Sequence, residues 1–320
     1  MDIHRRVKIG SRGVNITPLG FGTAPLGYLY SPVDEDIAVA TMVRAYQLGI
    51  RWFDTAPLYG QGIAEIRLGL ALKTIPRDVV TIATKVGYVV PDLPSNAINA
   101  ALPQDFSYDG VLRSFEASLR RLDCGYIDIL QIHDPDNHYN DAMEGAYHAL
   151  RRLLEEGIVR AIGVGMNQSA LLTRFAQDGE FDSLLVAGRY TLLDQSALDD
   201  LMPMALKHHV AILVGGVFNS GILADPWAVH PPFNYGPANE EWIHKARALD
   251  RWCRHEGIPL KAAALQFPFG HAAVAGVLIG ARTVDELEEN VEMSQYPILE
   301  AFWQHGKVLG FITKRAPIPR

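Results

Sequence analysis

Three apolar segments of this sequence end in side chains that can exchange protons. The side chains are Asp54, Tyr59, which follows five positions after it, Lys85 and His133. A carboxylate, a phenol, an ammonium and an imidazole can together polarise a carbonyl group or take the proton of an alcohol. This combination predicts a site that helps hydride to add to a C=O bond, or to leave a carbinol carbon.

In this interpretation the phenol of Tyr59 exchanges the proton, and its pKa has to fall for that purpose. Free tyrosine has a pKa of about 10, so exchange near neutrality needs a decrease of roughly three units, or about 4 kcal/mol. One ammonium about 4 Å away supplies about that much at an effective dielectric constant near 20. Lys85 is the candidate cation, Asp54 would keep it charged, and His133 could position a carbonyl oxygen.

Each of these residues also has an ordinary structural interpretation. Asp54 could cap a turn or a helix, Lys85 could be solvated, and His133 could form a structural pair with Asp134. Their joint placement at three strand ends favours the functional interpretation, because the carboxyl ends of parallel barrel strands meet at one rim.

A regular alternation of strands and helices has to position these groups. Barrel strands are expected at residues 19–22, 50–54, 79–85, 127–133, 161–165, 184–187, 211–214 and 276–279. Helices are expected near residues 34–48, 64–73, 108–122, 141–156, 169–177, 198–208, 240–256, 259–270, 283–295 and 300–309. Alternation of this kind predicts the α/β class and a closed (β/α)8 TIM barrel with right-handed crossovers.

Segments outside the alternation complete this outline. An N-terminal β-hairpin is expected over residues 7–17, and the last two helices close the chain. Residues 88–107 are expected to form a long loop and residues 216–239 a loose, proline-rich insertion. Without a linker or a break in composition, residues 1–320 are interpreted as one domain.

Composition excludes several other classes of protein. The 320 residues are 48% hydrophobic and 20% charged, which is typical of a globular protein, and the net charge of -7 argues against nucleic-acid binding. The longest apolar stretch, residues 262–280, is interrupted by polar side chains, and the N-terminus has no signal-peptide core, so no membrane partner is expected. The two cysteines lack metal-type spacing; we expect no metal and a cytoplasmic location.

Several motifs, in order along nearly the whole chain, resemble the aldo-keto reductases. They are FDTAPLYG from residue 53, Thr84-Lys85, LQIHD at 130–134, IGVGMN at 162–167 and LIGARTVDELEEN at 278–290. The resemblance implies a barrel that binds NAD(P)(H) at its carboxyl-terminal rim. It also implies that Asp54, Tyr59, Lys85 and His133 form a catalytic tetrad with Tyr59 as general acid or base.

The same resemblance implies a set of cofactor contacts. Asn167 matches an asparagine that bonds the nicotinamide carboxamide, Glu289 and Asn290 match a pair that grips the adenine, and residues 217–221 match a loop around the pyrophosphate. The cofactor-binding residues expected in this way are Gly22, Thr23, Asp54, Asn167, Val217, Phe218, Ser220, Gly221, Arg282, Glu289 and Asn290.

The chain departs from the family pattern at three cofactor positions. Ala187, Gly215 and Met166 stand where a glutamine, a stacking aromatic residue and a serine are usual, and Tyr190 could compensate by packing nearby. For the choice of cofactor, a guanidinium at residue 282 could clamp a 2′-phosphate, while Glu286 would oppose it. NAD and NADP both stay open, with a slight preference for NADP.

Within the family, TKVG at 84–87, HDP at 133–135 and RYTLLDQ at 189–195 resemble the aldose 1-dehydrogenase branch, to which pyridoxal 4-dehydrogenase is similar. The function implied is oxidation of an aldose, such as L-fucose or a related sugar, at C1 to the lactone, with hydride transfer to NAD(P). The alternatives are pyridoxal 4-dehydrogenase, a general NADPH-dependent aldehyde or ketone reductase, and a nucleotide-binding regulatory subunit without turnover.

A small sugar or aldehyde is therefore the expected partner of the chain. A sugar pocket should combine hydroxyl-binding groups with an apolar or aromatic wall. Tyr88, His138 and the insertion at residues 216–239 are expected to provide these, with Trp227 and Phe233 as candidate walls.

Overall fold

A closed barrel of parallel strands, in the order β12-β3-β4-β5-β6-β7-β8-β9, is the central element of the computed structural model, which describes residues 2–29, 31–90 and 101–319. The barrel strands are β3 (Leu19–Gly22), β4 (Trp52–Asp54), β5 (Thr81–Val86), β6 (Ile129–His133), β7 (Ala161–Met166), β8 (Ser183–Ala187), β9 (Ala211–Gly215) and β12 (Val274–Ile279). The predicted (β/α)8 barrel is thereby confirmed, with every predicted barrel strand present within a few residues.

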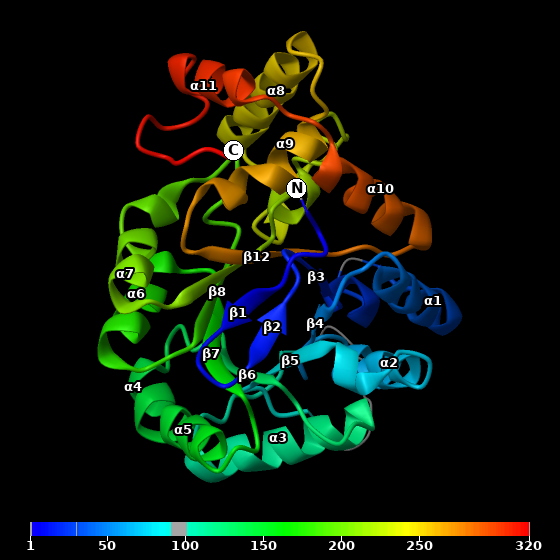
Figure 1. Cartoon of the computed structure of the whole chain (residues 1–320), viewed down its shortest axis with the longest axis vertical. Coiled ribbons are helices and arrows are strands. Elements are labelled where there is room, and N and C mark those ends of the chain that lie inside the picture. The colour runs from blue at the N-terminus through cyan, green and yellow to red at the C-terminus, as the bar shows by residue number, and fades with distance from the viewer. Residues whose placement is uncertain (1, 30, 91–100, 320) are drawn as a thin grey trace.

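Helices surround this barrel, as Figure 1 shows, and the N-terminal hairpin lies across one of its ends. The helices are α1 (Glu35–Gln47), α2 (Ile63–Leu72), α3 (Tyr108–Leu122), α4 (Tyr139–Asp141), α5 (Tyr147–Glu155), α6 (Ser169–Asp178), α7 (Leu201–His208), α8 (Glu240–His255), α9 (Leu260–Gln266), α10 (Val284–Gln295) and α11 (Glu300–Val308). None of the helices in the described ranges has the length and apolar character needed to cross a membrane.

Local signals set several helix boundaries where the sequence predicts them. The carboxylate of Asp34 accepts hydrogen bonds from the backbone N–H groups of Asp36 and Ile37, which caps the start of α1. Thr283 caps α10 in the same way, by accepting from the N–H of Glu286. These caps satisfy N–H groups that have no partner within the helix.

The structure differs from the sequence prediction between residues 139 and 156. Instead of one helix, α4 leads into a π-helical turn (Ala142–Ala146) and then into α5. Gly145 in this turn lies directly against the backbone of Phe106, where an added Cβ would be 2.3 Å from the carbonyl oxygen. A close backbone contact of this kind does not change the spacing of hydrophobic residues, so the sequence pattern did not predict the π-helical turn.

The two loops also contain more pairing than expected. Tyr88 and Gln104 form an antiparallel bridge across the predicted loop at 88–107, of which residues 91–100 lie outside the described part of the chain. The insertion at 216–239 contains a short hairpin, β10 (Pro232–Phe233) and β11 (Gly236–Pro237). Both features bring side chains toward the carboxyl-terminal rim.

Alternation along the barrel strands separates two sets of buried side chains. Successive residues of a strand point to opposite faces, so one set packs outward against the helices and the other fills the barrel. On β6, for example, Leu130 and Ile132 belong to the outer core, whereas Ile129 packs inside the barrel with Trp52 and Ala83.

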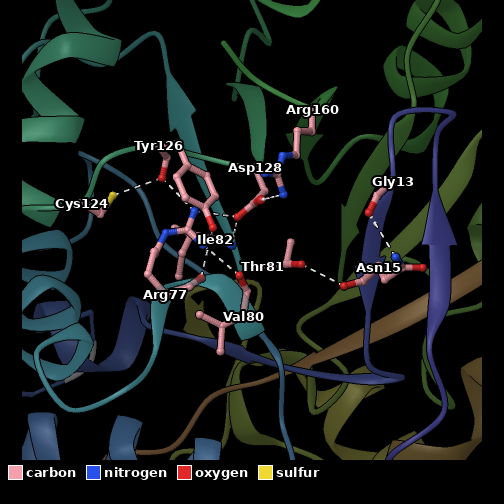
Figure 2. Close-up of polar contacts among 10 residues, drawn as sticks. All are labelled: Gly13, Asn15, Arg77, Val80, Thr81, Ile82, Cys124, Tyr126, Asp128 and Arg160. Atoms are coloured by element: carbon pink, nitrogen blue, oxygen red, sulfur yellow. Dashed lines mark hydrogen bonds and ion pairs between the residues drawn. The ribbon is translucent and has the colours of Figure 1, made fainter. Parts of the chain in front are cut away.

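The N-terminal hairpin, β1 (Val7–Ile9) and β2 (Val14–Ile16), closes the amino-terminal end of the barrel. Ile9, Val14 and Ile16 are buried in the same cluster as Trp52. The hydroxyl of Thr81, the first residue of β5, donates to the carbonyl oxygen of Asn15 over 2.8 Å, as Figure 2 shows. With this end filled, the opposite rim is left for a ligand.

The buried carboxylate of Asp128 links neighbouring segments by hydrogen bonds at the same closed end of the barrel. Asp128 accepts hydrogen bonds from Arg77 Nη2 at 2.7 Å and from the backbone N–H of Ile82 at 2.9 Å (Figure 2). Arg160 Nη1 lies 3.3 Å from its second oxygen, and the guanidinium groups of Arg77 and Arg160 both contact the ring of Tyr126, 3.8 and 4.9 Å from its centroid. This network is structural, because it lies at the start of the strands, away from the polar groups at their carboxyl ends.

Candidate active site

Strand alternation and register place the three predicted strand-end groups inside the carboxyl-terminal rim. Asp54, Lys85 and His133 follow inward-facing residues at even spacing on the neighbouring strands β4, β5 and β6. All three side chains are buried, with exposed fractions of 3%, 1% and 7%. Three polar residues that are far apart in sequence are thereby concentrated on one patch of a barrel.

The ammonium of Lys85 is the centre of this patch. It donates to Asp54 Oδ1 at 2.5 Å, to the carbonyl oxygen of Thr55 at 2.9 Å and to the hydroxyl of Tyr59 at 3.2 Å. Burial raises the pKa of Asp54, and the adjacent Lys85 opposes that rise. The three contacts use all three N–H donors of the ammonium, so its position is fixed.

His133 completes the patch as a neutral imidazole. Burial, together with the positive charge of Lys85, lowers its pKa well below the ordinary value. The ring packs edge-on against the rings of Tyr59 and Tyr88, with centroids 5.7 and 5.3 Å apart. Nδ1 is buried and has no hydrogen-bond partner among the described residues, whereas Nε2 lies 3.6 Å from Asp134 Oδ2. An unpaired buried acceptor is tolerated better than an unpaired N–H, so Nε2 carries the proton.

Three of these four side chains border a cavity of about 600 Å³. Of the predicted catalytic residues, Tyr59, Lys85 and His133 line it directly, and Asp54 lies behind Lys85. Its walls include Tyr28, Leu29, Leu58, Tyr88, Gln104 and Tyr235. A cavity of this size, with an aromatic and apolar wall and a few polar groups at one end, is suited to a small molecule.

Several residues that the sequence suggested as pocket walls lie elsewhere. Trp227 bonds Asp250 through its indole N–H, and Phe233 stacks on Trp242 at 4.3 Å. His138 pairs with Asp141 near the surface. In the 216–239 insertion it is Tyr235, at the tip of the β10–β11 hairpin, that reaches the cavity.

Three lining residues, Tyr28, Gln104 and Tyr235, were not predicted, because loops bring them to the rim. Tyr28 follows a short 3-10 turn in a left-handed conformation, and Gln104 arrives through its bridge with Tyr88. No spacing rule in the sequence signals such contacts, although the aromatic residue at 28 follows the first barrel strand closely.

The predicted pyrophosphate loop contains a left-handed stretch of backbone. Asn219, Ser220 and Gly221 have positive φ values of 47°, 63° and 115°. The loop is anchored by Asn219, which accepts from the hydroxyl of Thr191 and donates to the carbonyl of Gly188. The N–H groups of Asn219 and Gly221 bond the carbonyl oxygens of Gly216 and Phe218 within the loop, so an anion would have to bind to other N–H groups of this turn.

Other predicted cofactor residues lie along the same rim. Asn167 lines the cavity, and Thr23 binds the carbonyl oxygen of Asp54 through both its N–H and its hydroxyl. A Cβ added at Gly22 would meet no atom closer than 3.8 Å, so the strand end is open there. Asp54 Oδ2 is buried without a hydrogen-bond partner within the described chain, which leaves an acceptor for a hydroxyl group. The donors, the acceptor and the open strand end fit a dinucleotide.

The three positions that depart from the family pattern lie in the cavity wall or directly beside it. Ala187 lines the cavity, and a Cβ at Gly215 would be only 3.4 Å from Leu185 and 3.7 Å from Ala187. Tyr190 does not compensate, because its ring is fully buried against Phe267 and His271. The expectation that it packs against the nicotinamide site is therefore wrong.

The segment predicted to choose between NAD and NADP forms a closed ion pair. Arg282 Nη2 lies 2.7 Å from Glu286 Oε1, and the backbone N–H of Arg282 donates to the other carboxylate oxygen at 2.8 Å. Glu289 pairs with Lys261 at 2.6 Å, and Asn290 donates to the carbonyl oxygen of Gly280. The guanidinium at position 282 is thus already neutralised.

Comparison with known proteins supports the family inferred from these residues. The model of the aldo/keto reductase family matches residues 18–305. A pyridoxal 4-dehydrogenase from Microbacterium luteolum is 36% identical over 95% of this chain and 97% of its own length. A D-threo-aldose 1-dehydrogenase from Pseudomonas is 35% identical over 91% and 93%, and an L-galactose dehydrogenase from Arabidopsis thaliana is 32% identical over 88% and 86%.

Solved structures agree on the fold. The holo form of an aldo-keto reductase from Bacillus halodurans superposes with a TM-score of 0.80 at 24% identity, and it covers 99% of this chain and 98% of its own. A glycerol dehydrogenase from Gluconobacter oxydans gives a TM-score of 0.79 at 22% identity over 100% and 98%. The chain therefore belongs to the aldo-keto reductase family and is an NAD(P)-dependent oxidoreductase that acts on CH–OH groups.

Proposed function

We propose that the chain oxidises an aldose, such as L-fucose or a related sugar, at C1 to the lactone. The observation that carries this proposal is the ammonium of Lys85, shared between Asp54 and the hydroxyl of Tyr59 at the inner end of a cavity. Relatives named as aldose and galactose dehydrogenases, at 35% and 32% identity, support the substrate class.

In the proposed reaction Tyr59 is the general base. Its phenolate, stabilised by Lys85, takes the proton of the C1 hydroxyl, while the neutral Nε2–H of His133 donates to the same oxygen and orients the sugar. A bound nicotinamide would supply the acceptor for the hydride from C1. Asp54 holds the ammonium in place and does not exchange protons with the substrate.

The dinucleotide contacts are proposed on the same basis. We assign Gly22, Thr23, Asp54, Asn167, Val217, Phe218, Ser220, Gly221, Arg282, Glu289 and Asn290 to cofactor binding, with residues 217–221 holding the pyrophosphate through backbone N–H groups. For the choice of cofactor we propose NAD, which reverses the slight preference inferred from the sequence. Glu286 neutralises Arg282 and would repel a 2′-phosphate.

Pyridoxal is the second candidate substrate. The relative named pyridoxal 4-dehydrogenase is 36% identical, and the aromatic wall of Tyr28, Tyr88 and Tyr235 suits a planar ring. A general aldehyde reductase would need fewer polar side chains in the wall of the cavity.

A substrate panel separates these candidates. Aldoses, pyridoxal and simple aldehydes are tested with NAD, NADP and their reduced forms, and the absorbance of the reduced nicotinamide is followed. We expect the highest kcat/KM for an aldose with NAD. A higher value for pyridoxal would select the second candidate, and efficient turnover of simple aldehydes alone would contradict both.

A further inference from the structure

A carboxylate outside the predicted tetrad lies at the reacting end of the cavity. Asp134 follows His133 directly, lines the cavity and keeps 34% of its side chain exposed there. None of the four roles assigned above to Asp54, Tyr59, Lys85 and His133 uses it. A carboxylate facing a small-molecule cavity in this way needs a positive partner or hydrogen-bond donors.

The backbone of Asp134 is fixed from two sides. Its φ of +46° lies in the left-handed region, its N–H donates to the carbonyl oxygen of Gly165 at 3.0 Å, and its carbonyl oxygen accepts from Gln104 Nε2 at 3.1 Å. Left-handed residues other than glycine are uncommon, and aspartate tolerates this conformation better than most. The strand end and the loop therefore hold the carboxylate over the edge of the His133 ring.

Within the described part of the chain, most of the acceptor capacity of this carboxylate is unused. The hydroxyl of Tyr88 donates to it, and His133 Nε2 lies 3.6 Å away, beyond a good hydrogen bond. An ionised carboxylate offers about four lone-pair sites. Of the other charged or titratable groups that face it, Lys85 is held by three other acceptors and Asp136 is itself a carboxylate. Among the described residues no further donor faces the carboxylate, so water fills the remaining sites or a bound ligand takes its place there.

The distance between donor and acceptor indicates which ligand fits. His133 presents an N–H and Asp134 an acceptor, 3.6 Å apart. An oxygen on the reacting carbon can accept from the first, while a hydroxyl on the next carbon donates to the second. Oxygens on adjacent carbons are separated by a similar distance, so one molecule can satisfy both groups at once.

We propose that Asp134 is the specificity-determining residue for a hydroxyl group on the carbon next to the reacting carbon. The inference rests on the proposed function, because it assumes that the reacting oxygen binds at His133. In an aldose the group recognised is the C2 hydroxyl. Asp134 binds substrate and takes no part in the transfer of the proton or the hydride.

The ionisation of Asp134 adds a pH dependence. Burial and the neighbouring Asp136 raise its pKa to about 6, although Lys85 and the Tyr88 hydroxyl oppose the rise. Burial, with Asp134 and Asp136, also raises the pKa of Tyr88, which therefore stays protonated as a donor. The carboxylate accepts the substrate hydroxyl above pH 6 and loses that ability as the pH falls below it. Among the described residues, the other titratable groups at this end of the cavity are Lys85, Tyr59 and His133, which is neutral throughout this range.

Pairs of substrates that differ only in the hydroxyl at C2 measure how much this group contributes to recognition. D-arabinose and 2-deoxy-D-ribose differ only at C2 and are compared in oxidation, while lactaldehyde and propanal differ only at C2 and are compared in reduction. The quantity measured is the ratio of kcat/KM within each pair. Loss of one hydrogen bond to a charged acceptor predicts a ratio of about 10 to 100 for the wild type at pH 7.5.

Asp134→Asn is the test variant, because asparagine keeps both the shape and the tolerance for a left-handed backbone. We expect the ratio to fall about 10-fold or more, with the acid limb near pH 6 lost from the profile of the hydroxylated substrate. Asp136→Asn is the matched control. It should keep the ratio at pH 7.5 and move the acid limb to lower pH, because it removes a repelling charge.

Three results would overturn the inference. A ratio near one in the wild type means that no C2 hydroxyl is recognised. An equal decrease for both members of a pair in Asp134→Asn means that Asp134 only positions His133. If neither sugar is oxidised, the proposed function fails, and the lactaldehyde and propanal pair still decides the role of Asp134; absence of turnover with all four compounds would overturn both.

Discussion

Replacing Lys85 with methionine removes the charge on which the proposed base depends while keeping an unbranched side chain of similar length. The ammonium lies 3.2 Å from the hydroxyl of Tyr59. At an effective dielectric constant of about 20, a charge at that distance stabilises a phenolate by about 5 kcal/mol. The carboxylate of Asp54, 2.5 Å beyond the ammonium, cancels part of this effect. We therefore expect kcat/KM for oxidation at pH 7 to fall about 10²- to 10³-fold.

The assay is the pH dependence of kcat/KM between pH 6 and 10.5, because a base that has lost its cation works only at higher pH. In Lys85→Met the activity should continue to rise toward pH 10, the ordinary range of a phenol. A profile with the same pH dependence as the wild type, scaled down uniformly, would refute the role of the ammonium in activating Tyr59.

Stability has to be separated from chemistry in this variant. Lys85→Met leaves Asp54 buried without its cation, which typically costs about 3–5 kcal/mol. The double variant with Asp54→Asn removes both charges and should recover most of the free energy of unfolding, measured in urea. Activity at pH 7 should stay low in the double variant; its recovery along with stability would show that the single variant had merely lost its structure.

Three further predictions follow from other contacts. Asp128→Ala should lower the free energy of unfolding by about 3 kcal/mol, because it leaves the partly buried charge of Arg77 without its carboxylate, and KM should not change; a raised KM would link the closed end of the barrel to the site. Glu286→Gln frees Arg282 and should improve the Kd for NADP about 10-fold relative to NAD in a fluorescence titration, whereas equal changes would contradict the proposed cofactor choice. Asp134→Asn should raise the free energy of unfolding by about 1–2 kcal/mol at pH 8, after allowance for partial exposure, and this gain should disappear as the pH falls below 4. The sign follows from the raised pKa, because ionising this carboxyl group is less favourable in the folded state than in the unfolded state, so its charge lowers stability above pH 6. A loss of stability in Asp134→Asn at pH 8 would contradict this sign.

One physical reason explains why the sequence predicted both the barrel and the polar side chains at its rim. Hydrophobic runs that end in Asp54, Lys85 and His133 fix both the strands and the polar groups that follow them, and parallel strands bring such ends together. The period of two along each strand then points these side chains inward. No long-range information was needed beyond the closure of the barrel.

The walls of the cavity depended on contacts that the sequence does not encode in a period. Tyr235 reaches the cavity through a two-residue pairing of β10 with β11, and its N–H donates to the hydroxyl of Ser220. Gln104 arrives by a single bridge to Tyr88. The prediction for Tyr190 was wrong because its ring packs against Phe267, and this contact depends on the three-dimensional arrangement of the segments.

The ion pair between Arg282 and Glu286 could be predicted from the sequence only in part. A spacing of four residues predicts an ion pair on a helix, but here the arginine precedes α10. Thr283 caps the helix, and the carboxylate of Glu286 folds back to the N–H of Arg282, which joins the two side chains at the helix start. The sequence contained both charges, and only the cap showed that they neutralise each other.

The most direct measurement is the rate of sugar oxidation by Tyr59→Phe, which removes one hydroxyl from beside Lys85 and little else. The coenzyme Kd, from fluorescence titration, reports whether the dinucleotide still binds. With binding retained, kcat/KM is predicted to fall about 10²- to 10⁴-fold, the usual contribution of a general acid or base. A variant that oxidises the sugar as fast as the wild type would show that another group removes the proton.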